Sequence, residues 1–304
     1  MNTAPSSPLS SPSTTAARER ALVLGGGGST GNAWLIGVIA GLFDAGLDVT
    51  SADLTIGTSA GATAAAQLAG ASPTELLAAV LAAVPPPRTG PVGARPVTDH
   101  LERFRRIIAE ADDQADLRRR MGAAALATVA ASDGSWPQRW RDIVAARLPT
   151  QDWPRRAVLI TAVDARTGDP VVFDRHSGVD LVDAVAASTS GGGSAFSIGD
   201  GWYIDGGYRS NAENADLAAG YHRVLVLSPL SGRSLYPPEW GTQLAAQVDE
   251  LRAGGSRVET IVPDSASDHL FGANAMDPSL RPAAAQAGRD QGRSLVERLT
   301  EFWR

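Results

Sequence analysis

Residues 54–61 read Leu-Thr-Ile-Gly-Thr-Ser-Ala-Gly, and this stretch does most to decide the fold. Its first three residues form a short apolar run that is typical of a buried strand. The next five, Gly57-Thr58-Ser59-Ala60-Gly61, fit the G-x-S-x-G nucleophile elbow, in which a serine occupies a strained turn between a strand and a helix. The pentapeptide alone also suits a plain glycine-lined turn. The strand before it and the alanine-rich helix after it favour an elbow centred on Ser59.

A glycine loop lies upstream, after another short apolar strand at residues 21–24. The run Gly25-Gly-Gly-Gly-Ser-Thr-Gly31 ends that strand, and Ser29 or Thr30 is the expected cap of the next helix. Converging backbone N–H groups in such a loop suit an oxyanion hole or a phosphate cradle. The order strand, glycine loop, helix, strand, tight turn, helix predicts a parallel α/β sheet with right-handed crossovers.

The same loop is compatible with a dinucleotide-binding site. Gly26, Gly28 and Gly31 have the G-x-G-x-x-G spacing. The acidic residue expected at the end of the second strand is poorly matched, because Asp48 and Asp53 precede that strand. The serine elbow that ends the second strand therefore favours an oxyanion hole.

The remaining elements are read from composition and apolar periodicity. Residues 1–20 are rich in Ser, Thr, Pro and Ala, which predicts a disordered tail before one α/β domain over residues 21–304. Prolines at 85–87 and Arg-rich amphipathic helices at 99–108 and 115–129 predict a helical insertion at about 85–150. Further strands are expected at 157–163, 171–173, 202–204, 224–227 and 258–262, and helices at 181–187, 240–251 and 282–303.

Two absent residue types narrow the chemistry. The 304 residues include no cysteine, which excludes thiol nucleophiles and disulfides, and no lysine, which excludes a Ser-Lys dyad and a Schiff base. The four histidines are scattered, so a multi-histidine metal site is not expected. The net charge of −6 argues against nucleic acid as a partner. With no apolar run of membrane-spanning length and no secretory signal, the sequence predicts a soluble cytoplasmic protein.

Asp205-Gly206-Gly207 ends a short apolar strand in the second half of the chain. Asp-Gly is by itself a strong turn signal, so a structural turn is one interpretation. A serine hydrolase also needs a base, which is normally a histidine oriented by an acid. His269 would complete the order Ser…Asp…His of the α/β-hydrolases. In that fold, however, the serine follows several strands, whereas Ser59 follows only the second.

The three motifs together resemble the patatin-like phospholipase family over about residues 22–217. The shared features are Gly-Gly-Gly-x-x-Gly, then Gly-x-Ser-x-Gly about thirty residues later, then Asp-Gly-Gly. The resemblance implies a three-layer α/β/α sandwich with a mainly parallel central sheet and a Ser-Asp dyad of Ser59 and Asp205. It places the oxyanion hole at backbone N–H groups of four residues, Gly26, Gly27, Gly28 and Ser29. The supporting glycines of the elbow and of the Asp-Gly-Gly turn are Gly57, Gly61, Gly206 and Gly207.

By this resemblance the protein is a lipid acyl hydrolase of the phospholipase A or carboxylesterase type that works through an acyl-enzyme. No metal or organic cofactor is implied. The expected partner is a lipid or another acyl ester, with transient contact to a membrane surface, and the oligomeric state stays open. Two alternatives remain: an acyltransferase, and a catalytically silent protein of the same fold that binds an anionic or lipid ligand.

Two positions depart from the family pattern. Thr30 stands where the family's glycine loop usually carries a basic residue, which would stabilise the loop or polarise the site. Residues 189–193, Thr-Ser-Gly-Gly-Gly, replace a proline-containing turn with a more flexible chain. By the resemblance, the change at Thr30 is expected to lower activity or alter substrate choice, and the change at 189–193, which borders the acyl pocket, is expected to affect specificity for phospholipid. Neither departure touches Ser59 or Asp205.

The insertion also carries residue types that can bind lipid. Arg103, Arg105, Arg106 and residues 118–120 can meet phosphate, but acidic residues interleave with them, which favours a solvated helix face with ion pairs. Packing is likewise the preferred interpretation of the three tryptophans of this region, Trp136, Trp140 and Trp153.

Overall fold

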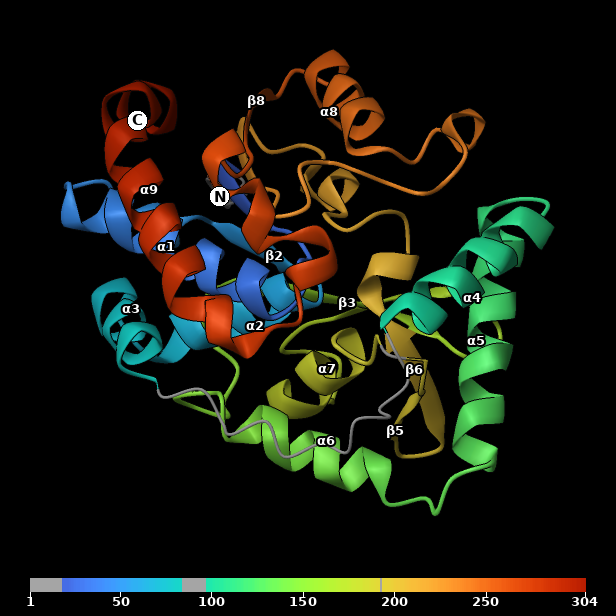
Figure 1. Ribbon diagram of the computed structural model, residues 1–304. Coiled ribbons are helices and arrows are strands. Elements are labelled where there is room, and N and C mark those ends of the chain that lie inside the picture. Colours follow the sequence, from blue (N-terminus) through green and yellow to red (C-terminus); the bar gives the residue numbers. More distant parts are fainter. Residues whose placement is uncertain (1–17, 84–96, 192) are drawn as a thin grey trace, which may run out of the picture.

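The computed structural model describes residues 18–83, 97–191 and 193–304, and for residues 97–101 it describes the helical backbone alone. In this part of the chain eight strands form one sheet in the order β5-β6-β3-β2-β1-β7-β8, with β4 paired to β3 (Figure 1). The strands are β1 (Arg20–Leu24), β2 (Leu54–Gly57), β3 (Ala157–Asp164), β4 (Pro170–Phe173), β5 (Phe196–Ile198), β6 (Gly201–Asp205), β7 (Arg223–Leu227) and β8 (Arg257–Ile261). The strands β3, β2, β1, β7 and β8 are neighbours in this order and run parallel to one another. At the other edge of the sheet, β4 and β6 pair antiparallel with β3, and β5 pairs antiparallel with β6.

Helices cover both faces of this sheet. They are α1 (Gly28–Asp44), α2 (Ala60–Gly70), α3 (Pro73–Ala82), α4 (Val97–Glu110), α5 (Gln114–Ala130), α6 (Trp136–Ala145), α7 (Leu181–Ser188), α8 (Leu244–Ala253) and α9 (Arg281–Trp303). In β1, Leu22 and Leu24 join the core on the side of α1 and α9, whereas Ala21 and Val23 join the core on the side of α8. A strand buried on both faces reads as a continuous apolar run. The three-layer α/β/α architecture with a mainly parallel sheet is confirmed.

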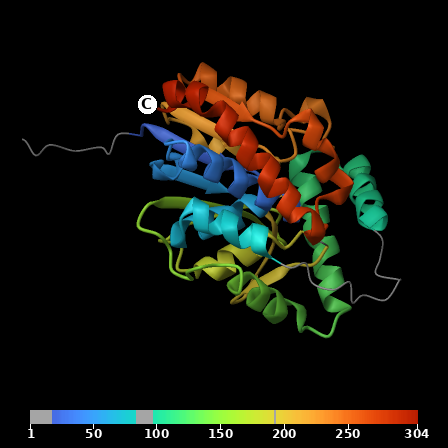
Figure 2. The same ribbon diagram turned by 60° about the vertical axis from the view of Figure 1, so that its left-hand side comes forward.

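The first helix is fixed in place by the last one. Figure 2 shows α9, in red, lying along α1, in blue. Small residues permit this close approach: a Cβ on Gly37 would lie 2.1 Å from the Ala285 carbonyl oxygen, and one on Gly288 would lie 2.4 Å from the Trp34 carbonyl oxygen. The C-terminal helix therefore holds α1, whose N-terminus carries the glycine loop.

Most elements start and end within about two residues of their predicted positions, but several predictions were wrong. The helix after the glycine loop begins at Gly28 with Gly27 as N-cap, not at Ser29 or Thr30, and no side chain caps it. Helix α8 starts at Leu244 and not at about residue 240. A short 3₁₀ turn ends at Trp240, and Gly241, which follows it, has a φ of 66°. Three elements were not predicted: α3, α6, which begins with Trp-Pro, and the three-residue strand β5.

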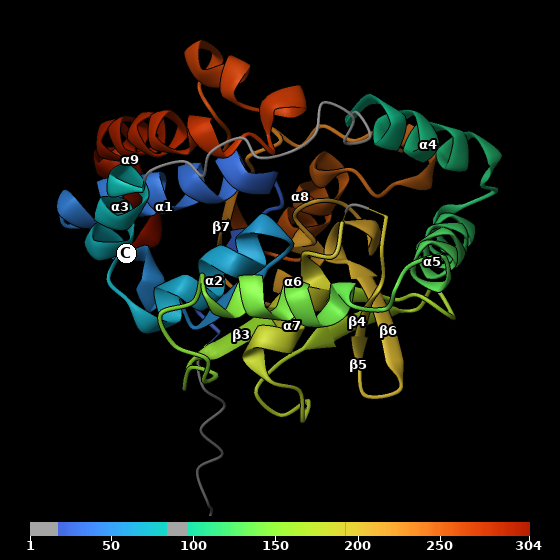
Figure 3. The same cartoon turned by 60° about the horizontal axis from the view of Figure 1, so that its bottom comes forward.

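The predicted helical insertion holds α4, α5 and α6. Helices α4 and α5 stand beside β6 at the antiparallel edge of the sheet (Figure 3), where Leu117 and Met121 pack with Val163 and Ile204. The part of the insertion at residues 84–96, residues 1–17 of the predicted tail, and Gly192 of the glycine-rich segment lie outside the described residues. None of the described helices is both long and apolar enough to span a membrane.

Candidate active site

Ser59 occupies a strained turn between β2 and α2. Its backbone angles are φ 52° and ψ −113°, a combination that is rare for any residue other than glycine. The turn is tight because α2 starts directly against β1: a Cβ on Gly61 would lie 1.9 Å from the Leu24 carbonyl oxygen. This geometry is that of a nucleophile elbow, so the structural context that the sequence predicted around Ser59 is present.

The sheet brings Asp205 to Ser59 although 146 residues separate them. Gly57 pairs with Ile160 on β3, and Ala162, two residues further along β3, pairs with Asp205 on β6. Ser59, two residues after Gly57, is therefore level with Asp205. Its Oγ donates a hydrogen bond to Oδ2 of Asp205 at 2.8 Å.

The surroundings of Asp205 tune its acidity. Its other oxygen, Oδ1, accepts a hydrogen bond from the Gly207 N–H at 2.8 Å. Burial raises the pKa of the Asp205 carboxyl to about 6, against the opposing effect of the bonds from Gly207 and Ser59. A carboxyl group with a pKa near 6 is ionised at neutral pH and is a stronger base than an exposed aspartate.

The glycine loop lies directly beside Ser59, since a Cβ on Gly26 would be 3.4 Å from the Ser59 Cβ. The Gly26 N–H donates to the Ala212 carbonyl at 2.8 Å, so this predicted oxyanion donor is already occupied. In the described part of the chain, the N–H groups of Gly27, Gly28 and Ser29 have no hydrogen-bond partner. They form the first turn of α1, where the helix dipole favours negative charge.

Ser188 supports the elbow from the end of α7. Its Oγ accepts a hydrogen bond from the backbone N–H of Ser59 at 3.0 Å, and its side chain is fully buried. No role for this hydroxyl was predicted from the sequence. The contact joins α7 to the turn that carries Ser59.

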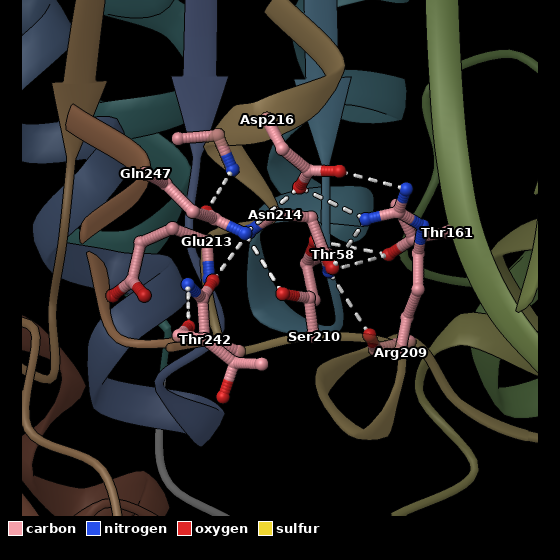
Figure 4. A network of polar contacts seen from close by, with 12 residues as sticks. Thr58, Thr161, Arg209, Ser210, Glu213, Asn214, Asp216, Thr242 and Gln247 are labelled. Carbon is pink, nitrogen blue, oxygen red and sulfur yellow. Dashed lines mark hydrogen bonds and ion pairs between the residues drawn. The ribbon is translucent and has the colours of Figure 1, made fainter. Parts of the chain in front are cut away.

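A buried polar network that was not predicted from the sequence includes Thr58, which precedes Ser59, and Asn214 (Figure 4). Nδ2 of Asn214 donates to the Thr58 Oγ1 and to the Gly206 carbonyl, each at 3.0 Å. Thr58 and Thr161 also share a hydrogen bond at 2.9 Å. The only signal in the sequence is the run of polar residues that follows Asp-Gly-Gly, at 209–216.

The outer part of this network is an ion pair. The Arg209 guanidinium bonds both oxygens of Asp216 at 2.9 Å and also bonds Oδ1 of Asn214 at 3.1 Å (Figure 4). Gln247 of α8 donates to Asp216 at 2.9 Å and accepts from the Ala215 N–H at 2.9 Å. The segment after Asp205 is therefore tied to both α8 and the strand ends.

A guanidinium group also lies at the glycine loop, although Thr30 replaces the basic residue of the family pattern. Thr30 is fully buried, and its N–H donates to the Ala275 carbonyl. Arg281, at the start of α9, donates to the Ser29 carbonyl at 2.7 Å and to Oδ1 of Asn32 at 3.0 Å. This contact spans 252 residues between Arg281 and Ser29, and no local motif predicts it.

The structure does not bring the alternative base to the nucleophile. His269 is exposed, and within the described residues its ring hydrogen-bonds only with the Ala266 carbonyl, at 3.0 Å. Among the described residues there is also no group of three His, Cys, Asp or Glu side chains arranged to hold a metal ion.

The other residues of the insertion mainly make structural contacts. Arg119 and Arg120 pair with Asp116, as the ion-pair interpretation predicts. Trp140 and Trp153 donate to the Ala186 and Val179 carbonyls, which agrees with packing roles. Arg103 donates to the Ala124 carbonyl, and Arg118 donates to the Gly168 and Arg209 carbonyls.

Among solved structures, VipD from Legionella pneumophila is similar with 14% identity and a TM-score of 0.43, over 92% of this chain and 67% of that chain. The type III effector ExoU matches with 17% identity and a TM-score of 0.38, over 92% of this chain and 53% of that chain. ExoU in complex with SpcU, from Pseudomonas aeruginosa, gives 17% identity and a TM-score of 0.40, with coverage of 93% and 53%. The chain thus spans between about half and two thirds of the length of these proteins.

A search of the curated proteins gives no match. The comparison with protein families matches residues 22–216 to the family described as patatin-like phospholipase. This range contains the glycine loop, the serine elbow and Asp205, and it covers more than half of the chain. The chain therefore belongs to the patatin-like phospholipase family.

Proposed function

We propose that the protein is a serine lipid acyl hydrolase, of the phospholipase A or carboxylesterase type, with Ser59 as nucleophile and Asp205 as base. The observation that carries this proposal is the 2.8 Å hydrogen bond from Ser59 Oγ to Asp205 Oδ2 at a strained elbow. A nucleophilic hydroxyl within hydrogen-bond reach of a base is the basic requirement of covalent serine catalysis. Membership of the patatin-like phospholipase family supports the same reaction class.

In the first half of the proposed reaction, Ser59 Oγ attacks the ester carbonyl carbon while Asp205 accepts its proton. The carbonyl oxygen becomes an oxyanion, which the free N–H groups of Gly27, Gly28 and Ser29 stabilise. The intermediate collapses when the bond to the leaving alcohol breaks and Asp205 returns the proton to that alcohol. An acyl ester of Ser59 remains.

Water completes the cycle. Asp205 takes a proton from a water molecule, whose oxygen attacks the acyl ester through a second oxyanion. When the bond to Ser59 Oγ breaks, the proton passes from Asp205 to that oxygen, and a carboxylic acid is released. One oxyanion-hole donor contributes roughly 2.7–4 kcal/mol to such a transition state. The loop therefore supplies much of the stabilisation that a histidine-free site requires.

The apolar environment next to Asp205 supports a lipid substrate. Phe104 of α4 packs edge-on against Tyr208, with ring centroids 5.7 Å apart, and lies near Tyr236 at 6.2 Å. Burial raises the pKa of both tyrosines, and the nearby Asp205 charge adds to this effect. Tyr236 donates to the Gly207 carbonyl at 3.3 Å. Asp205 thus lies beside a buried aromatic cluster, an environment of low polarity that agrees with an apolar substrate.

The test is hydrolysis of p-nitrophenyl esters of increasing chain length, and of a phosphatidylcholine, by wild type and two variants. Ser59→Ala and Asp205→Asn should each lower turnover by roughly 10²–10⁴-fold or more without unfolding the protein. Asp200→Asn is the matched control, since Asp200 is an exposed acid in the β5–β6 turn. Free fatty acid as the product distinguishes hydrolysis from acyl transfer. Full activity of Asp205→Asn would overturn the proposed base.

A further inference from the structure

An open groove with a volume of about 460 Å³ lies away from the dyad, between α1, α2, α3 and the turn that follows α6. Figure 3 shows α2 with α3 and α6 on either side of it. Apolar side chains form most of the lining, among them Ile36, Leu76, Val80 and Leu148. Ser59, Asp205 and the loop residues 26–29 do not line it, so it is a separate feature of the surface.

Two arginines provide the charge of this groove, Arg147 after α6 and Arg281 at the start of α9. Among the described residues, the Arg147 guanidinium has no hydrogen-bond or ion-pair partner, and it stacks on the Trp140 ring at 5.3 Å. Arg281 bonds only neutral groups, on Ser29 and Asn32, and its Nε–H has no partner in the described chain. Among the described residues that line it, the groove thus has two cationic groups and no carboxylate.

Several other partly buried arginines of this protein are paired with a carboxylate. Arg141 pairs with Asp183 at 2.7 Å, Arg209 with Asp216 at 2.9 Å, and Arg289 with Asp44 at 3.1 Å. In the groove the two positive charges instead repel each other. Burial lowers the pKa of Arg281, and the charge of Arg147 lowers it further. An anion placed between the two guanidinium groups would remove this repulsion.

We propose that this groove binds a single-chain fatty acid, with its carboxylate between Arg147 and Arg281 and its hydrocarbon chain against the apolar wall of α3. The planar guanidinium fork matches the two oxygens of a carboxylate. Leu76 and Val80 lie one turn apart on α3 and, with Leu148, offer an apolar surface to the chain. The volume lies in the lower half of the range of about 300–1,000 Å³ for small-molecule sites, which favours one chain over two.

This site goes beyond the proposed function, because it does not require Ser59 to react. It would hold the same class of molecule that the proposed hydrolysis releases. Arg281 also bonds Ser29 at the glycine loop, and Asn32 bonds the Ala60 carbonyl beside Ser59 at 3.4 Å. A fatty acid bound to Arg281 would therefore lie one contact away from the loop, through Ser29, and two contacts away from the elbow, through Asn32 and Ala60.

The experiment is titration calorimetry of the full chain with dodecanoate, below its micelle concentration and at pH 8. One molecule should bind per chain. Arg147→Met removes one charge and Ala79→Trp fills the groove from an exposed position on α3, and each should weaken binding at least tenfold. Arg139→Met is the matched control, because Arg139 lies on α6, is exposed and does not line the groove. It should bind like wild type.

Head-group variation decides the ligand class. Dodecanol should bind at least tenfold more weakly than dodecanoate, because it lacks the charge. Tighter binding of dodecyl phosphate than of dodecanoate would overturn the assignment to a carboxylate. The site itself would be overturned if wild type showed no saturable binding of dodecanoate, or if Arg147→Met and Ala79→Trp bound dodecanoate as tightly as wild type does. Ester hydrolysis by the same variants is measured in a separate assay. Loss of the groove proposal would appear in the binding data, whereas loss of the proposed Ser59 chemistry would appear in the hydrolysis data.

Discussion

The Asn214 side chain lies with its Nδ2 atom 3.0 Å from Oγ1 of Thr58, and the same Nδ2 lies 3.0 Å from the Gly206 carbonyl oxygen. Thr58 precedes Ser59 and Gly206 follows Asp205, so one buried amide connects the backbones on both sides of the dyad. Asn214 has φ 55° and ψ 42°, a left-handed conformation that asparagine tolerates better than most residues. We therefore propose that Asn214 holds Ser59 and Asp205 in position relative to each other.

Replacement of Asn214 by glycine tests this role. Glycine keeps the left-handed backbone without strain, so Asn214→Gly removes the amide alone. We expect a stability loss of about 1–3 kcal/mol, because the buried Gly206 carbonyl loses its donor. We also expect a decrease of kcat by at least about tenfold with little change in KM, because the dyad geometry loosens. Urea unfolding and ester kinetics measure the two effects, and a stable variant with unchanged kcat would exclude the positioning role.

The acidity of Asp205 predicts the pH dependence of the reaction. In the proposed reaction the ionised carboxylate is the base, and burial raises the Asp205 pKa to about 6. The ratio kcat/KM should therefore be low at pH 5, rise through an apparent pKa near 6, and level off above about pH 7. A stopped assay between pH 4.5 and 8.5 measures it. A midpoint near 3.8, the ordinary value for this group, would show that burial does not control the base.

Glu213 predicts a separate pH effect on stability. It is 1% exposed and accepts a hydrogen bond from Ser228 Oγ at 2.6 Å, and burial raises its pKa from 4.5 to about 7. The folded state thus holds the proton more tightly than the unfolded state. The protonated Glu213 therefore contributes up to about 3 kcal/mol to the free energy of unfolding. This contribution is fully present below pH 4.5 and is lost as the pH rises through about 7.

The change Glu213→Gln isolates this effect. The variant keeps a neutral side chain of the same shape, so its free energy of unfolding should fall less than that of wild type between pH 5 and 8. Chemical denaturation at several pH values gives both curves. Glu239→Gln, at an exposed position, should follow wild type. Parallel curves for wild type and Glu213→Gln would show that Glu213 titrates normally.

Gly61 predicts a strict size limit at the elbow. A methyl group there would lie 1.9 Å from the Leu24 carbonyl oxygen, which is fixed in the sheet. We expect Gly61→Ala to destabilise the protein by at least about 3 kcal/mol, or to prevent folding. Ala64→Gly in the same helix serves as a comparison, with an expected loss of about 1 kcal/mol from helix propensity. Equal thermal midpoints for the two variants would contradict the close packing of α2 on β1.

The sequence predicted the parts of the site that local motifs encode. The elbow needs small residues around Ser59, and Asp205 ends a strand, so both left a local signal. The strand pairings that make them neighbours follow from the parallel α/β pattern. Asn214, Ser188 and Arg281 left no comparable signal, because each acts through a partner more than 100 positions away.

The errors in the fold have local causes. Ser29 and Thr30 look like helix caps, but Gly27 takes that position and Thr30 is buried instead. The start of α8 was placed too early because the 3₁₀ turn at Pro238–Trp240 continues the helical pattern until Gly241 breaks it. Gly26 was predicted as an oxyanion donor, but its N–H is bonded to the Ala212 carbonyl. This bond could not be predicted from the sequence, because it depends on how the chain returns to the glycine loop after Asp205.

The central claim, that Asp205 activates Ser59, is tested most directly by the rate at which a fluorophosphonate labels the protein. Mass spectrometry of the labelled chain identifies the modified residue, and the rate is followed between pH 5 and 8. The account predicts labelling at Ser59, with a rate that rises through pH 6 in wild type and is lower by at least about 10²-fold in Asp205→Asn at every pH. Labelling of Ser59 at the same rate in Asp205→Asn, or modification of a different serine, would contradict it.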